Sequence, residues 1–157
     1  MTSKKTGFFK LLTIILVLLG FAPAAMAAES GTRDEARAMV ERAATFYKAN
    51  GKEKSLAAFG DPKGQFVDRD LYLITYGLDG IRLSHPYNPK LIGKSAAEAV
   101  DFDGKPYGKE IIDTANTKGS GWVDYKFTDP TTKKLSDKTT YVLKVNDIII
   151  ACGVYKH

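Results

Sequence analysis

The sheet of this protein is decided by residues 139–155, TTYVLKVNDIIIACGVY. Two runs rich in β-branched and aromatic residues, 139–145 and 148–155, flank Asn146-Asp147, which is typical of a tight turn between antiparallel strands. A third run of the same kind, 121–128, precedes them across the turn residues Asp129-Pro130-Thr131-Thr132. The C-terminal part of the chain is therefore predicted to be a three-stranded antiparallel meander.

A β-hairpin is predicted upstream of this meander. Residues 71–76, LYLITY, and 81–84, IRLS, are separated by Leu78-Asp79-Gly80, where Asp and Gly favour a short reversal of the chain. With the three strands of the meander, the hairpin makes a sheet of five antiparallel strands.

Helices are predicted before and between these strands. Thr32-Arg33-Asp34-Glu35 has the pattern of a capping box, and apolar residues recur at helical spacing from Ala36 to Tyr47, before Asn50-Gly51. A shorter helix follows over residues 52–59, and a third covers 105–117. Residues 85–104 are irregular, with one helical turn at 95–100. The order predicts a single α+β domain whose pocket lies between the sheet and this long insertion.

The N-terminus has the organisation of an export signal. Lys4, Lys5 and Lys10 precede an apolar core at 11–22, and Ala25-Met26-Ala27 fits the A-x-A cleavage rule. We predict cleavage after Ala27, so residues 1–27 are a signal peptide and 28–157 the mature domain. The alternative is an uncleaved anchor, although the apolar run is shorter than the roughly 20 residues that cross a bilayer. After cleavage, the mature domain is expected to be periplasmic or secreted.

The charge balance argues against nucleic acid as a partner. The whole chain has 23 Lys and Arg against 18 Asp and Glu, but three of the lysines lie in the predicted signal. The remaining 20 basic and 18 acidic residues are scattered singly, whereas a nucleic-acid-binding protein concentrates positive charge on one face.

Motifs for metal binding or catalysis are missing from the sequence. The two histidines, His85 and His157, do not form a metal-binding pattern, and no nucleophile elbow or phosphate loop occurs. Asp101-Phe102-Asp103-Gly104 resembles the start of a calcium loop, but Ile112 stands where the loop needs its glutamate, so a plain turn is predicted. Cys152, the only cysteine, is predicted to be a small buried hydrophobe. We therefore predict no enzyme, no cofactor and no metal.

Polar and aromatic residues in the extended segments are the candidates for binding. On the strand at 121–128, alternation places Trp122 on one face and Tyr125 on the other, so both reach one site only if the strand is bulged or the site wraps its edge. Core packing is the simpler role for Trp122. Arg82 and Lys138 could supply positive charge, or could be solvated cations at strand edges.

Several short pieces of the chain, in order, carry a family resemblance. They are Gly80 to Pro86, Leu91 to Lys94, Asp103 to Lys105, Gly119 to Tyr125, Lys138 to Tyr141 and Gly153 to Tyr155. Together they resemble the single Cache domain of bacterial extracellular sensors, in its second single-domain subfamily, from about residue 37 to 156. The resemblance implies a PAS-like fold with a long N-terminal helix and a five-stranded antiparallel sheet that holds a small-ligand pocket.

The same resemblance implies a function and a set of ligand contacts. Cache domains of this type sense small organic molecules, often short carboxylates, in chemoreceptors and histidine kinases. The chain departs from the receptor pattern because no membrane helix follows its last strand, so a separate membrane receptor or histidine kinase is the implied partner. A ligand-free interaction module is the alternative, and pairing of the first helix in a homodimer stays open. The matching contact positions are His85, Tyr87, Trp122, Tyr125, Lys138 and Tyr141. Arg82 is added as a predicted contact because either Lys138 or Arg82 could be the cation that holds the carboxylate.

Overall fold

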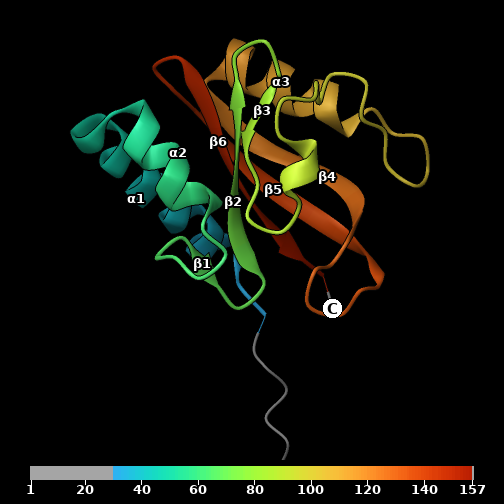
Figure 1. Cartoon of the computed structure of the whole chain (residues 1–157). Coiled ribbons are helices and arrows are strands. Elements are labelled where there is room, and N and C mark those ends of the chain that lie inside the picture. Colours follow the sequence, from blue (N-terminus) through green and yellow to red (C-terminus); the bar gives the residue numbers. More distant parts are fainter. Residues whose placement is uncertain (1–29, 157) are drawn as a thin grey trace, which may run out of the picture.

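A computed structural model describes residues 30–156 of the chain, so the predicted signal peptide lies outside the described residues (Figure 1). The helices are α1 (Arg33–Asn50), α2 (Lys52–Gly60), the short 3-10 helix η1 (Pro89–Leu91) and α3 (Tyr107–Lys118). The strands are β1 (Val67–Asp68), β2 (Leu71–Gly77), β3 (Arg82–Ser84), β4 (Ser120–Thr128), β5 (Leu135–Val145) and β6 (Ile148–Tyr155). Within residues 30–156, no helix combines the length and the apolar character that a bilayer crossing requires.

The strands form one antiparallel sheet in the order β1-β2-β6-β5-β4, and β3 also pairs with β2. The last strand, β6, therefore lies at the centre of the sheet, between β2 of the hairpin and β5 (Figure 1). The five predicted strands are confirmed, with two differences. A two-residue strand, β1, is added, and β5 begins at Leu135 instead of Thr139, because paired residues 135–138 extend the ladder with β4. Lys138 consequently lies within a strand.

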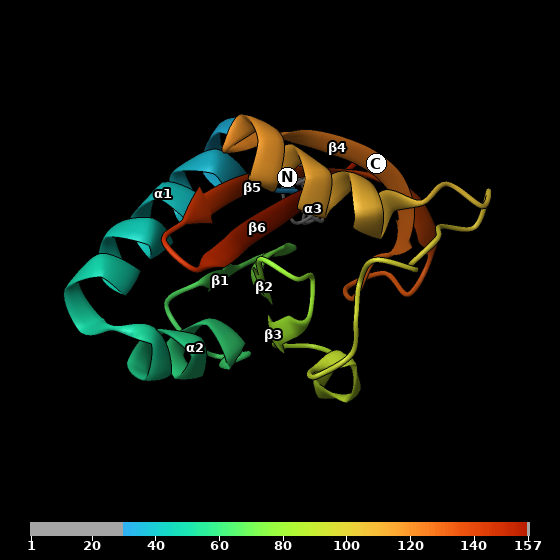
Figure 2. The same cartoon turned by 90° about the horizontal axis from the view of Figure 1, so that it is seen from above.

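Both faces of the sheet are covered. One face packs on α1 and α2 through residues such as Val40, Phe59 and Ile150, and the other packs on α3 and the long insertion through residues such as Ile111, Tyr125 and Ile149. Figures 1 and 2 show α1 and α3 on different sides of the central strands. This double cover explains why β6 is buried at every position instead of alternating.

The insertion differs from its predicted form. The helical turn expected at 95–100 is not formed, and η1 lies earlier, at Pro89–Leu91. The start of this segment is tied to the hairpin instead, since Ile81 forms a β-bridge with Ser95 and the Ala96 N–H donates to the Gly80 carbonyl, and residues 97–98 form a turn. This pairing to the hairpin overrides the local preference for a helix.

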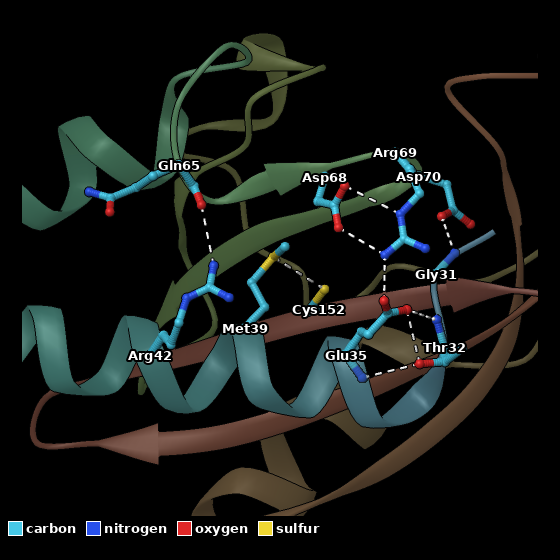
Figure 3. A network of polar contacts seen from close by, with 10 residues as sticks. All are labelled: Gly31, Thr32, Glu35, Met39, Arg42, Gln65, Asp68, Arg69, Asp70 and Cys152. Atoms are coloured by element: carbon cyan, nitrogen blue, oxygen red, sulfur yellow. Dashed lines mark hydrogen bonds and ion pairs between the residues drawn. The ribbon is translucent and has the colours of Figure 1, made fainter. Parts of the chain in front are cut away.

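A polar network fixes the start of α1 (Figure 3). The Thr32 hydroxyl accepts from the Glu35 N–H, and the Glu35 carboxylate accepts from the Thr32 N–H at 2.8 Å, which confirms the predicted capping box. Arg69 donates to Glu35 at 2.7 Å and to Asp68 at 2.8 Å. The bond from Arg69 and those from Thr32 lower the pKa of Glu35 to about 2. The network therefore ties α1 to the β1–β2 turn.

The cap is expected to contribute measurably to stability. Replacing Thr32 with alanine should lower the free energy of unfolding by about 1 kcal/mol, because an N–H of the first turn loses its acceptor. Urea denaturation measures the change. Thr45→Ala is the matched control, since Thr45 is an exposed threonine of the same helix whose hydroxyl bonds only back to the Glu41 carbonyl. Equal losses in the two variants would contradict the role of the cap.

Cys152 is fully buried on the α1 side, with its sulfur 3.9 Å from the sulfur of Met39 (Figure 3). Burial raises the pKa of the thiol to about 12, so it stays protonated at neutral pH. The prediction of a small buried hydrophobe is confirmed.

Candidate ligand-binding site

A small cavity lies between the sheet and the insertion, where the sequence predicts the pocket. Its volume is about 10 Å³, close to the space that a single water needs. The wall comes from three strands, the insertion and the start of α3, and consists of Ile74, Tyr76, Arg82, His85, Leu91, Tyr107, Tyr125 and Phe127. Aromatic rings dominate this lining, and Arg82 adds a positive charge.

Lys138 is not part of this lining but lies behind it, with its amine 5.5 Å from the centre of the Phe127 ring and its side chain only 1% exposed. Its ammonium donates to the hydroxyl of Tyr72 at 2.9 Å and to that of Tyr155 at 3.0 Å. The amine also lies 4.4 Å from the centre of each of these two rings. An ammonium has three N–H donors, and these two phenols occupy two of them.

Burial without a contacting carboxylate gives Lys138 an unusual pKa. Desolvation lowers it from 10.5 to about 7, and the more distant charges of Asp129 and Asp70 act in the opposite direction. The ion pairs found between residues 30 and 156 include neither Lys138 nor Arg82. A buried cation without an ion-pair partner is costly, which makes this position a candidate for binding an anion.

His85 supplies a further donor at the cavity wall. Its Nδ1 accepts from the N–H groups of Tyr87 at 3.3 Å and Asn88 at 3.1 Å. In the neutral ring the proton is therefore on Nε2, and this buried atom has no hydrogen-bond partner within the described residues. Burial, with the charges of Lys138 and Arg82, lowers the pKa of His85 to about 4, so the ring is neutral at pH 7.

Arg82 is the second buried cation, at 6% exposure. One of its nitrogens donates to the Ser95 carbonyl at 3.1 Å, which attaches the insertion to β3. Its charge opposes the rise that burial causes in the pKa of Tyr76 and Tyr107. Of the two alternatives that the sequence leaves for Arg82, the solvated cation at a strand edge is excluded because the side chain is buried. A role as a cation of the site stays a prediction.

Tyr125 completes the wall on β4. Its ring stacks on Tyr107 with centroids 4.3 Å apart, and its hydroxyl accepts from the Thr140 hydroxyl at 3.0 Å. The phenolic proton of Tyr125 is not needed for this bond, so it can be donated to a ligand. Tyr87 lies over the site from the insertion, 40% exposed, with its ring 5.1 Å from Tyr72.

The structure brings five of the seven predicted contact residues to one face of the sheet and leaves two on the other. Trp122 and Tyr141 pair with each other on the α1 side, under Arg33, which lies 4.1 Å from the Trp122 ring, and Arg37, 5.7 Å from the Tyr141 ring. Strand alternation is the reason. Arg82, His85, Tyr87, Tyr125 and Lys138 therefore lie together on the insertion side and stay the proposed ligand contacts, whereas Trp122 and Tyr141 do not share this site.

Other residues of the site were not singled out from the sequence. Tyr72 and Tyr155, which hold the Lys138 amine, and Tyr107 and Phe127, which line the cavity, all lie on this face. In the sequence they look like ordinary buried aromatic residues, and only their contacts with the Lys138 amine or with the cavity show that they belong to the site.

The site thus presents hydrogen-bond donors and positive charge within an aromatic wall. A carboxylate matches this arrangement, because its oxygens accept from charged and neutral donors alike and charge-assisted bonds are the stronger kind. Within the described residues, no group of three or more His, Cys, Asp or Glu side chains could hold a metal ion.

Comparison with known families agrees with this class of site. The chain belongs to the single Cache domain 2 family, whose sequence profile matches residues 2–157. Cache sensor domains occur in chemotaxis proteins and histidine kinases, and the domain is sensory in function.

Three relatives give the resemblance more detail. Sensor histidine kinase MctS of Rhizobium johnstonii is 30% identical over 89 residues, which are 55% of this chain and 19% of the kinase, so the match spans about a fifth of its length. A Cache chemosensory domain studied for carboxylic acid recognition is 26% identical, with a TM-score of 0.68 over 79% of this chain and 92% of that one. A methyl-accepting chemotaxis protein from Vibrio parahaemolyticus shares the fold, at 20% identity and a TM-score of 0.67 over 78% of this chain and 86% of that one.

Proposed function

We propose that this protein is an extracytoplasmic domain that binds a short monocarboxylate and reports its presence to a membrane partner. The observation that carries the proposal is the cluster of buried donors around Lys138, Arg82 and His85, which has positive charge but no contacting carboxylate among the described residues. The related chemosensory domain studied for carboxylic acid recognition supports the same ligand class.

The size of the cavity sets a condition on binding. Acetate has four heavy atoms and does not fit within about 10 Å³, so the insertion must move outward to admit it. Tyr87 and Leu91 are the parts of the insertion that cover the site, and both are at least partly exposed. At a ceiling of about 1.5 kcal/mol per heavy atom, acetate can gain about 6 kcal/mol, which corresponds to a dissociation constant in the tens of micromolar.

The ligand proposal is tested by calorimetry and thermal shift with acetate, propionate, pyruvate and lactate. Tyr125→Phe is expected to weaken binding about tenfold, because a hydroxyl donor facing the cavity is lost. Tyr141→Phe is the matched control and should bind as the wild type does, since Tyr141 lies across the sheet. Loss of binding in the Tyr141 variant instead would place the ligand on the α1 side.

A ligand-free interaction module is the second candidate, and the small cavity volume favours it. In that case the side chains fill the pocket permanently, and the sheet and α1 dock a receptor, a kinase or a second copy of the chain. It predicts that none of the four carboxylates raises the melting temperature, whereas ligand binding to the native state must raise it.

Export with cleavage after Ala27 is part of the proposal. The intact mass of protein recovered from the periplasm tests it, since cleavage leaves Ala28 as the first residue. A mass that retains residues 1–27 would support the anchor instead. The proposed partner is a separate membrane receptor or histidine kinase, and light scattering with and without ligand tests a homodimer through α1.

A further inference from the structure

Gly153 lies beneath the side chain of Lys138. On the insertion side of β6 the residues are Ile149, Ala151, Gly153 and Tyr155. Lys138 on β5 pairs directly with Tyr155, and Thr140 pairs with Gly153. Gly153 is therefore the gap in an otherwise filled row, diagonally adjacent to the lysine.

The Lys138 side chain passes over β6 through the space that Gly153 leaves. Its backbone is on β5, but its amine bonds Tyr72 on β2, which lies beyond β6 in the sheet. A Cβ atom built on Gly153 would lie 1.9 Å from Cε and 3.0 Å from Cδ of Lys138. No carbon can approach another so closely without a bond, so any side chain at 153 displaces the lysine.

Backbone conformation does not explain the glycine. Among residues 30–156, the glycines with positive φ are Gly51, Gly80, Gly93, Gly104 and Gly119, and Gly153 is not one of them. Its backbone is that of an ordinary strand residue, where glycine weakens the strand and often marks the close approach of another group. Here the approaching group is Lys138.

The same gap accommodates a second site residue. A Cβ at 153 would lie 2.6 Å from the hydroxyl of Thr140, which donates to the Tyr125 hydroxyl. The absence of a side chain at 153 thus affects both the cation and the phenol that face the ligand.

We propose that Gly153 is a positioning residue of the anion site: by leaving space above β6, it lets Lys138 reach across the strand and hold its amine at the cavity. This inference rests on the proposed function, in which Lys138 is the charge partner of a carboxylate. Gly153 itself contacts no ligand in this account, and it acts through Lys138.

Gly153→Ala tests the proposal, with Gly121→Ala as the matched control. Gly121 is also a strand glycine, and a Cβ there would meet the Thr114 methyl at 2.6 Å, so the control disturbs packing against α3 without touching Lys138. Binding of acetate and propionate by calorimetry should weaken at least about tenfold in Gly153→Ala and stay near wild type in Gly121→Ala.

A direct probe of the lysine separates positioning from general damage. The Lys138 Cε resonance, followed by NMR against pH, should titrate near 7 in the wild type, in line with the lowered pKa. In Gly153→Ala the amine is pushed out of its buried position, so the midpoint should rise by at least about one unit toward the ordinary value. An unchanged midpoint together with unchanged binding would overturn the proposal.

A double variant covers the case in which Gly153→Ala does not fold. Lys138→Ser removes the stem that collides with the new methyl group, so Gly153→Ala should cost less stability in the Lys138→Ser background than in the wild type. The double variant should bind no more tightly than Gly153→Ala alone, because the amine is missing. If adding Lys138→Ser leaves the damage from Gly153→Ala unchanged, the glycine is needed for reasons other than the lysine, and the proposal is overturned.

The NMR titration and the stability of the double variant need no ligand. They test the inference even if the wild type binds none of the carboxylates, in which case the proposed function fails alone. Conversely, carboxylate binding that Gly153→Ala leaves intact overturns the positioning role and leaves the proposed function standing.

Discussion

Replacing Lys138 with methionine is expected to stabilise the domain by about 2 kcal/mol at pH 6 while weakening carboxylate binding at least about thirtyfold. Lys138 is buried without an ion pair, and desolvation lowers its pKa from 10.5 to about 7. Methionine has a similar length and no charge, so it keeps the packing over Gly153 and removes the desolvation cost. The net gain is smaller than that cost, because the bonds from the amine to Tyr72 and Tyr155 are lost as well.

The sign of this effect depends on pH. Between pH 7 and 10.5 the unfolded chain holds a proton on Lys138 that the native state does not, so the contribution of this group to stability rises with pH. Its cost is fully present below pH 7 and vanishes above pH 10.5. The advantage of Lys138→Met over the wild type should therefore be largest near pH 6 and disappear toward pH 10.5.

Urea denaturation at pH 6 and pH 10 measures both parts of this prediction. Lys144→Met is the control, because Lys144 is an exposed lysine of the same strand and its replacement should leave stability nearly unchanged at both pH values. A Lys138→Met variant that is less stable than the wild type at pH 6 would show that the hydrogen bonds of the amine outweigh its burial.

The fold could be predicted from the sequence to a large extent because its signals are local. The capping box at Thr32, the turn at Asn146-Asp147 and the runs of β-branched residues each specify one element without help from the others. The prediction was wrong in the insertion, where pairing of Ile81 with Ser95 replaces the expected helical turn. Long-range pairing of that kind leaves no local pattern.

The separation of Tyr141 from Lys138 has a specific cause. Lys138 and Tyr141 are three positions apart on β5, so alternation alone places them on opposite faces. The predicted strand began at Thr139, which left Lys138 in a loop and hid this conflict. Residues 135–138 are mostly polar and are poor strand formers, and only the ladder with β4 shows that the strand continues through them.

The character of the site could not be predicted in the same way. Burial of Lys138 depends on the space left by Gly153, fifteen positions later on a neighbouring strand. The proton on Nε2 of His85 depends on how the chain turns after it, so that two backbone N–H groups meet Nδ1. The burial of Lys138 and the proton position of His85 both depend on tertiary contacts, so they could not be predicted from the residue types alone.

The largest expected effect of solution conditions is on binding. Affinity for acetate or propionate should fall by about tenfold for each pH unit above 7. The fall ends at the pKa of Lys138 in the bound state, because above that pH the amine is deprotonated with and without ligand. At pH 9 only about 1% of free protein has a protonated amine if the pKa is near 7, so affinity should be about 100-fold lower than at pH 6. An anion bound against the amine restores its proton, which means that binding takes up a proton from solution.

Other groups around the cavity do not produce this profile. The pKa of His85 is lowered to about 4, and burial raises the pKa values of the surrounding phenols above the ordinary value: Tyr72, Tyr76, Tyr107, Tyr125 and Tyr155. Burial likewise raises the pKa of the Cys152 thiol, to about 12. Among the groups described around the site, Lys138 alone titrates between pH 6 and 9.

Calorimetry in two buffers of different ionisation enthalpy tests this coupling directly. At pH 8 the apparent enthalpy of binding should depend on the buffer, with an uptake approaching one proton per ligand, whereas at pH 5.5 the dependence should vanish because Lys138 is already protonated. Tyr141→Phe should show the same behaviour as the wild type. An affinity that stays constant from pH 6 to 9, with no proton uptake, would mean that the bound carboxylate does not use the Lys138 amine, and Arg82 would then be its charge partner.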